Sequence, residues 1–267
     1  MVVKLTYAIH QKPYISLEKF QKQWREVHGP LVSSLQTPLK LVKYVQAHRT
    51  PGSADDAVRA ARPQVVDKNE TPWAVVDEYY FDFSSIKDFH EHLFFPGAQD
   101  AWRTLFNHEK GLVDFDRSQL FFVAEHLQVA TDAAAQTLAS EYNSVNLAFA
   151  FVEFSEGSGA MQHWICNHAP LIRRYAAALG FDKYIQNHPR DGGEAALSHL
   201  REERGIKEGR YSSYASFWIN ERAATNDAAM QRAAKEVSAD EVSGFVKAKT
   251  GNCLIAKELV FVDQWRV

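Results

Sequence analysis

The residues best suited to proton transfer lie in two short motifs near the N-terminus. Trp24 and His28 are four residues apart in a segment predicted to be helical, so they share one face of the helix with Phe20. Gly29-Pro30 follows and is typical of a helix end, which places His28 in the last turn, where the helix dipole favours a protonated imidazole. A histidine in this position can act as an acid or a base near neutral pH.

The second motif is Tyr44-Val-Gln46-Ala-His48, which reads as a strand. Strand alternation sends the three polar side chains to one face and the small apolar pair to the other. The apolar pair suits a face covered by helices, so we expect the polar triplet to face the space between the two sheets. Polar groups on a buried face cost free energy unless one another, water or a ligand satisfies them. The three polar residues are either satisfied core groups inherited by both halves or the lining of a small-molecule site. As a set they favour a small-molecule site.

Both motifs occur twice in the chain. Each pair of matching residues is separated by 140 positions (164 − 24 and 188 − 48), and no gap is needed. This register predicts a tandem duplication. The matches are Trp24 with Trp164, His28 with His168, Tyr44 with Tyr184, Gln46 with Gln186 and His48 with His188.

The elements that position these motifs follow one order in both halves. Strands are expected at 2–9, 40–48, 73–83 and 119–129, with helices at 16–35 and 84–106, and the second half repeats this between 145 and 262. The resulting βαββαβ pattern predicts a ferredoxin-like α+β unit over 1–130, a linker over 131–141 and a second unit over 142–267. Their antiparallel sheets are expected to pack into an intramolecular α+β barrel with an enclosed cavity.

Two insertions follow the second motif in each half, over 49–72 and 189–210. They are longer than a ferredoxin-like connection requires, so we expect them to cover the cavity mouths. The run 194–208 is either part of such a cover or a solvated surface helix. On the third strand, the register places Ser216 where the first half has Glu78, a carboxylate that either serves the histidines or lies exposed.

Composition narrows the classes of partner. The chain has 30 basic and 33 acidic residues, a net charge of −3, without a basic run that would follow a phosphate backbone, so nucleic acid is not an expected partner. Neither a signal peptide nor an apolar run long enough for a bilayer is evident, which predicts a cytoplasmic protein without membrane contact. Cys166 and Cys253 fit no metal spacing, and no metal site is predicted.

These motifs, together with Glu78-Tyr-Tyr-Phe-Asp82 and Val123-Ala-Glu125-His126, resemble the EthD family of the dimeric α+β barrel superfamily. The resemblance extends over the chain as two copies, the second more divergent. It implies a fused dimer that acts without a cofactor on a small aromatic or polyketide-like molecule, as a dehydratase, decarboxylase or cyclase. A further homodimer of the fused barrel is compatible with it.

The first hypothesis is therefore a lyase or isomerase that uses histidine acid–base chemistry. Its candidate catalytic residues are His28, His48, Tyr44 and Glu78, and its candidate substrate-binding residues are Gln46, Trp24, His168, Tyr184, Gln186 and His188. The second hypothesis is a binding or accessory protein that holds a metabolite without chemistry. A third is a haem-binding barrel, with His28 or His168 as the axial ligand.

Overall fold

The computed structural model describes residues 2–131, 146–157, 159–211, 213–220 and 228–264, and most of the predicted linker lies outside these ranges. The first half contains β1 (Val3–Ile9), α1 (Leu17–Gln23), η1 (Trp24–His28), α2 (Gly29–Ser34), α3 (Gln36–Leu39), β2 (Leu41–Arg49), α4 (Ser53–Ala60), β3 (Val75–Phe81), α5 (Ile86–His92), α6 (Pro96–Glu109) and β4 (Gln119–Ala130). The second half contains β5 (Asn146–Val152), α8 (Ala160–His163), η2 (Trp164–His168), α9 (Ala169–Leu179), β6 (Phe181–Pro189), α10 (Glu194–Arg204), β7 (Ser213–Ile219), α11 (Ala228–Gly244) and β8 (Asn252–Asp263).

Eight antiparallel strands close into one barrel in the order β1-β3-β2-β8-β5-β7-β6-β4. The strands of the first half lie in the order β4-β1-β3-β2, and those of the second half repeat that order as β8-β5-β7-β6. The halves join at two seams, β2 with β8 and β4 with β6. The predicted antiparallel α+β barrel is therefore confirmed, and pairing at both seams leaves no free sheet edge.

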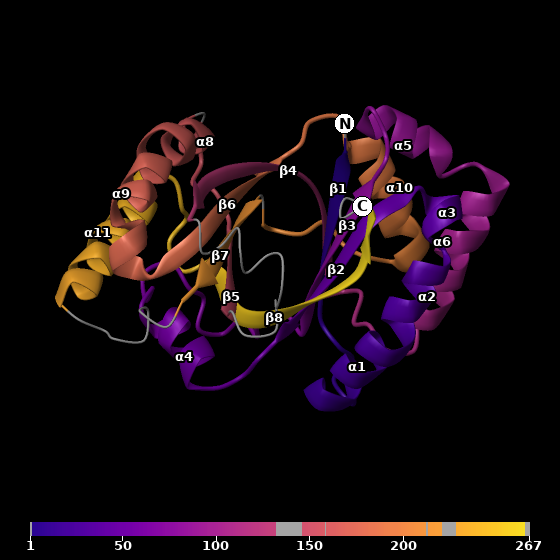
Figure 1. Ribbon diagram of the computed structural model, residues 1–267, viewed down its shortest axis with the longest axis horizontal. Helices are drawn as coiled ribbons and strands as arrows, with labels where there is room; N and C mark the ends of the chain where they lie inside the picture. The colour runs from indigo at the N-terminus through magenta and orange to yellow at the C-terminus, as the bar shows by residue number, and fades with distance from the viewer. Residues whose placement is uncertain (1, 132–145, 158, 212, 221–227, 265–267) are drawn as a thin grey trace.

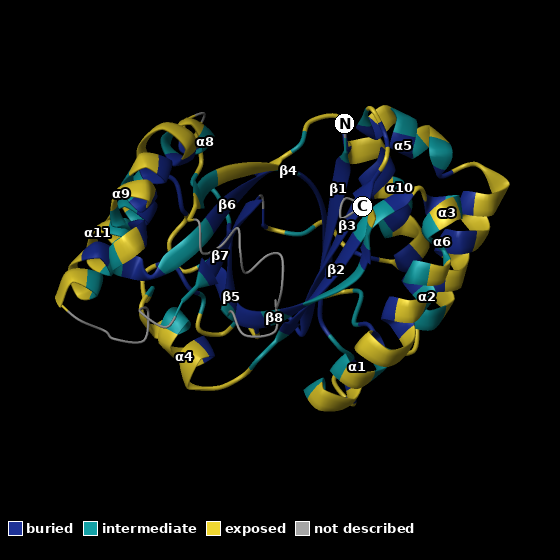
Figure 2. Ribbon diagram, in the orientation of Figure 1, coloured by how far each residue is buried: buried dark blue, intermediate teal, exposed yellow. Residues whose placement is uncertain are grey.

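Helices cover the barrel on two opposite sides (Figure 1). Strands are buried on both faces, whereas the outer faces of the helices are exposed (Figure 2). The core accordingly has three parts, which are one helix–sheet layer in each half and the barrel interior between them. The interior is occupied by large rings such as Phe121, Phe149 and Tyr214, so it is packed where an enclosed cavity was expected.

The first helical segment continues beyond the predicted stop. Pro30 lies in the first turn of α2, where a missing N–H is tolerated, so His28 precedes a new helix and does not end one. The expectation of a histidine protonated by a helix C-terminus is wrong, since burial lowers the pKa of His28 well below its usual value. A Cβ at Gly29 would overlap the ring of Phe261 from β8, so a larger residue here would require that ring to move.

Each insertion crosses to the opposite half. The first contains α4, which packs on β8, and the second contains α10, which packs on α5 and β4. Figure 1 shows α4 near the helices of the second half and α10 among those of the first. The helix α10 buries Ala196, Leu197 and Leu200, so it is a packed element and not a solvated one. We call these two insertions the crossing arms.

Among the described residues, no helix combines the length and the apolar character needed to cross a bilayer.

Candidate functional site

A short π-helix positions the predicted tryptophan and histidine in each half. In η1 the N–H of Gly29 donates to the carbonyl of Trp24 five residues earlier, and η2, over Trp164–His168, has the same length. Such turns are rare and are frequent at functional sites. In the first half the turn stacks the rings of Trp24 and His28, with centroids 3.8 Å apart and planes 19° apart. His28 and His168 are both buried beneath the helices.

The polar triplet of β2 faces the helices. Gln46 Nε2 donates to the Trp24 carbonyl (3.1 Å) and to the Tyr44 hydroxyl (2.8 Å), and His48 Nε2 lies 2.8 Å from Gln46 Oε1. The expectation that this triplet faces the space between the sheets is wrong. The glutamine is needed beneath η1 because it binds a carbonyl of the π-turn, whereas Ala47 faces the barrel interior, where large rings leave little room.

The second half repeats this arrangement on β6. Gln186 Nε2 donates to the Trp164 carbonyl (3.1 Å) and the Tyr184 hydroxyl (3.0 Å), and His188 Nε2 lies 3.0 Å from Gln186 Oε1. Burial lowers the pKa of both His48 and His188 to about 4, so both imidazoles are neutral at pH 7. The hydrogen bonds of these triplets go to protein groups, and their assignment to catalysis or substrate binding stays a prediction.

Glu78 lies on the opposite side of its strand from the histidines, inside the barrel. It accepts hydrogen bonds from Lys4 Nζ (2.7 Å), Tyr214 (2.8 Å) and Tyr80 (3.0 Å). The structure therefore does not bring it to His28 or His48. The predicted register is nevertheless right, because Glu78 pairs with Val45 and Ser216 pairs with the corresponding residue of β6.

The side chains beneath η1 form what we call the first site. It consists of Tyr7, Trp24, His28, Tyr44, Asp77, Tyr79, His108, Glu109 and Arg204. Its centre is Asp77, which accepts hydrogen bonds from Trp24 Nε1 (3.0 Å), Tyr44 (2.8 Å) and Tyr79 (3.1 Å). Burial raises the pKa of Asp77 to about 8, although these three hydrogen bonds oppose the shift.

A line of polar groups runs from Asp77 toward the surface. The Tyr79 hydroxyl lies 3.5 Å from His28 Nε2, and His28 Nδ1 lies 3.2 Å from Nδ1 of the partly exposed His108. Burial is the main cause of the lowered pKa values of both histidines. These linked groups form a polar route between Asp77 and the partly exposed His108.

The crossing arm of the second half completes the first site. Arg204, at the end of α10, places Nε 2.9 Å from Glu109 Oε2, and both side chains are 2% exposed. Burial raises the pKa of Tyr7 well above its usual value, Glu109 and Asp77 raise it further, and Arg204 opposes the shift. Among the described residues, the Tyr7 hydroxyl and Arg204 Nη1 are buried without a hydrogen-bond partner.

The corresponding side chains around η2 form the second site. It consists of Arg62, Ala150, Trp164, His168, Tyr184, Ala215, Phe217, Asp240, Glu241 and Phe245. His168 Nδ1 lies 2.8 Å from Asp240 Oδ2, and His163 Nε2 lies 2.8 Å from the other carboxylate oxygen. Burial opposes ionisation of Asp240, but the hydrogen bonds from the two histidines hold its pKa below the usual value. A carboxylate can only accept, so His168 presents Nδ1–H to Asp240 and its Nε2 faces the other side, toward Glu241.

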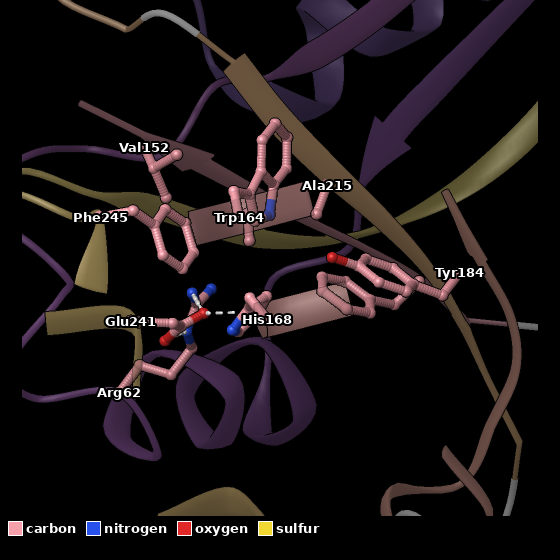
Figure 3. A pocket seen from close by; sticks show the side chains of 10 residues that line it. Arg62, Val152, Trp164, His168, Tyr184, Ala215, Glu241 and Phe245 are labelled. Carbon is pink, nitrogen blue, oxygen red and sulfur yellow. Dashed lines mark hydrogen bonds and ion pairs between the residues drawn. The ribbon is translucent and has the colours of Figure 1, made fainter. Parts of the chain in front are cut away.

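Arg62 reaches this site on the crossing arm of the first half. Its guanidinium pairs with Glu241 and donates to Cys253 Sγ (3.1 Å), and His168 Nε2 lies 4.0 Å from Glu241 Oε1. Figure 3 shows Arg62, Glu241 and His168 around a common space beneath the rings of Trp164 and Phe245. The cavity there measures about 10 Å³, which is room for one water molecule.

Strand register explains why the second site contains this cavity. Tyr7 pairs with Asp77, and Ala150 pairs with Ala215, so the two alanines stand where the first site has a phenol and a carboxylate. Tyr79 is likewise replaced by Phe217, since Tyr44 and Tyr184 are their respective partners. The Tyr7 and Asp77 side chains therefore occupy the first site, whereas the second has a cavity for one water molecule beside the two alanines.

Sequence reasoning missed the acidic and arginine residues of both sites. Asp77 lies next to Glu78 on a strand whose two faces are both buried, so alternation alone could not choose between them. Asp240 and Glu241 belong to a helix with many charged residues and read as solvated. Arg62 and Arg204 lie on the crossing arms, and no local pattern indicates that an arm reaches the opposite half.

No group of three or more histidine, cysteine, aspartate or glutamate side chains in the described part of the chain could hold a metal ion. Haem does not fit the described histidines either. Both ring nitrogens of His28 face protein groups, and the cavity beside His168 is far smaller than a macrocycle.

Comparisons with known proteins agree with this geometry at the level of fold. The solved structure of an anthrone oxidase-like protein is similar with a TM-score of 0.53 and 10% identity, over 98% of this chain and 94% of that one. A candidate monooxygenase from Lactobacillus acidophilus matches with a TM-score of 0.45 and 9% identity, over 98% and 96%. The comparison with curated proteins gave no match. Residues 12–116, in the first half of this eight-stranded antiparallel α+β barrel, match the EthD domain.

Proposed function

We propose that this chain is an enzyme that moves protons on a small organic molecule, and that the second site is its active site. The observation that supports the proposal is the arrangement of His168. Its Nδ1–H is fixed by Asp240, and its Nε2 is directed to the side of the cavity, beside Glu241. An imidazole oriented by a carboxylate in this way is a general base that can later return its proton as an acid.

The groups around His168 can stabilise the charge that such a base creates. When Nε2 removes a proton from a carbon next to a carbonyl group, the C–H electron pair forms a C=C bond and the π pair of the carbonyl group moves to its oxygen. The Arg62 guanidinium and the Tyr184 hydroxyl both line the cavity and can stabilise that oxygen. Return of the proton to a departing hydroxyl gives dehydration, and return to a different carbon gives isomerisation. If the enolate carbon attacks a second carbonyl group, the proton returns to the oxygen of that group and the product is cyclised. Lyase or isomerase chemistry without a cofactor follows from these steps.

The two halves are proposed to be tandem EthD-like units over 1–130 and 142–267. In support, the four strands of each half lie in the order fourth, first, third and second. In each half a π-helix also begins at a tryptophan and ends at a histidine, and the two π-helices are 140 residues apart (164 − 24). The aromatic or polyketide-like substrate class implied by the sequence then applies to the second site. The first site, filled by Tyr7 and Asp77, has become part of the core.

Recovery of the natural ligand tests this function. Protein purified from its own host is examined by native mass spectrometry, and the ligand found is incubated with the enzyme in D₂O. Conversion, or uptake of deuterium at carbon, is expected with the wild type. Loss of at least about a hundredfold in rate is expected with His168→Gln, since acid–base groups contribute about 10²–10⁴-fold. Equal rates in the two proteins would overturn the proposed role of His168.

A binding or accessory protein is the second candidate. The pairing of Arg62 with Glu241 favours it, because the two charges neutralise each other and leave neither free to stabilise charge that develops in a reaction. A ligand recovered with unchanged mass and without deuterium at carbon after long incubation would support this candidate over the enzyme.

A further inference from the structure

Inside the barrel, an amine and a carboxyl group that neither site uses are held on one tryptophan ring. Trp218 of β7 belongs to the cluster that fills the barrel. Lys183 precedes Tyr184, which lines the second site, so strand alternation directs Lys183 to the opposite face of β6, toward Trp218. Lys183 Nζ lies 4.2 Å from the centroid of the Trp218 ring, and Trp218 Nε1 donates to Glu258 Oε2 (3.0 Å). The indole therefore positions both groups.

The Lys183 amine differs from the buried Lys4 amine in the same barrel. Lys4 Nζ has three hydrogen-bond partners, whereas Lys183 Nζ forms no hydrogen bond or ion pair within the described ranges. Its ammonium form thus loses part of its hydration without a paired carboxylate in return. This burial lowers the pKa of Lys183, and the charge of Lys43 acts in the same direction. The carboxylates that oppose the shift are Glu258, Glu125 and Glu78.

The Glu258 carboxyl group is suited to give and take a proton near neutral pH. It is 6% exposed, and burial raises its pKa to about 7, although the hydrogen bond from Trp218 and the charge of Lys183 oppose the shift. Glu258 and Lys183 contact the same indole without forming an ion pair, so a group bonded to Lys183 Nζ lies next to the carboxyl group. Because Lys183 is only half-buried, a small molecule reaches its amine from solvent without opening the barrel.

We propose that Lys183 is a nucleophilic amine that forms an imine with a small aldehyde, with Glu258 as the acid for this step. The amine nitrogen attacks the carbonyl carbon, and a proton moves from nitrogen to oxygen to give a carbinolamine. Glu258 protonates the hydroxyl group, which leaves as water while the nitrogen lone pair forms the C=N bond. The iminium ion then returns its N–H proton to the Glu258 carboxylate. This chemistry uses neither His168 nor the second site, so it goes beyond the proposed function.

Benzaldehyde is the probe, with sodium cyanoborohydride to reduce the imine and peptide mapping by mass spectrometry to locate the benzyl group. At pH 7, Lys183 of the wild type is expected to be labelled about tenfold faster than any other lysine, and Lys183→Met is expected to lose this fast labelling. Lys43→Met is the matched control and should keep it, because Lys43 is the corresponding half-buried lysine of β2 (183 − 140) and lies over the Tyr80 ring. Circular dichroism shows that each variant is folded.

Glu258→Gln tests the acid, because glutamine keeps an acceptor for Trp218 Nε1 but cannot give up a proton. Loss of a negative charge beside Lys183 would by itself favour the neutral amine and speed labelling, so the expected slowing of about tenfold or more isolates the acid role.

Labelling of Lys183 no faster than that of Lys43 would overturn the inference, and an equal or faster rate in Glu258→Gln would overturn the role of Glu258. Mapping of the wild type decides the first point even if Lys183→Met does not fold. The rate of host-ligand conversion in His168→Gln bears on the proposed function alone, so the two can fail separately.

Discussion

The ion pair between Arg204 and Glu109 gives the sharpest test of how the crossing arms stabilise the fold. Both side chains are 2% exposed, and the arm that contains Arg204 comes from the opposite half. Arg204→Met leaves a buried carboxylate without its partner, and breaking such a pair costs about 3–5 kcal/mol of unfolding free energy. With a urea m value of about 3 kcal/mol/M, the midpoint is expected to fall by about 1–1.7 M.

Urea denaturation followed by tryptophan fluorescence measures this shift, with two controls. Arg103→Ala removes an exposed pair with Asp100, whose side chains are 65% and 73% exposed, and should change stability by less than about 0.5 kcal/mol. The double variant Arg204→Met/Glu109→Leu removes both charges and should recover most of the loss. A loss below about 1 kcal/mol in Arg204→Met, or no recovery in the double variant, would refute the buried arm contact.

Three further predictions concern the first half. Burial raises the pKa of Asp77 to about 8, above an unfolded value of about 3.9, so its contribution to stability is full below pH 4 and is lost as pH rises through 8. Thermal melting at several pH values should show that Asp77→Asn flattens this fall in stability. An unchanged dependence of stability on pH would contradict the raised pKa. Gln46→Leu removes the hydrogen bonds that Gln46 makes with the Trp24 carbonyl, the Tyr44 hydroxyl and His48 Nε2, and should cost about 1–3 kcal/mol in urea denaturation; a neutral effect would show that these hydrogen bonds do not stabilise the fold. Gly29→Ala should cost about 1–3 kcal/mol by overlap with Phe261, with partial rescue by Phe261→Leu; a stable single variant would show that the ring can move aside.

Much of the fold could be predicted because its two signals, the periodicity of strands and helices and the internal repeat, can be read from the sequence without tertiary structure. Strand alternation and helical spacing located β1–β4 and their counterparts, and a repeat of 140 residues indicated two similar sheets. Closure into one antiparallel barrel then followed, because each open sheet face needs a cover. The match of 12–116 to the EthD domain agrees with the resemblance found in the first half.

The site was less predictable because it depends on which face of a strand is covered by helices. Alternation grouped Tyr44, Gln46 and His48 correctly, but polarity was a misleading guide to their direction, since a π-turn carbonyl and a buried carboxyl satisfy them. His168 was recognised, whereas its partner Asp240 lies 72 residues away and could be found only from tertiary structure. The positions of Arg62 and Arg204 in the two sites likewise could be found only from tertiary structure.

The most direct test of the central claim compares His168→Gln with His28→Gln. The rate at which each folded variant converts the ligand recovered from the host is measured under the same conditions as the wild type. We predict a loss of about 10²–10⁴-fold for His168→Gln and a rate within a few fold of wild type for His28→Gln, because the first site is filled by Tyr7. Full activity in His168→Gln with loss in His28→Gln would place the reaction in the first site and contradict the account.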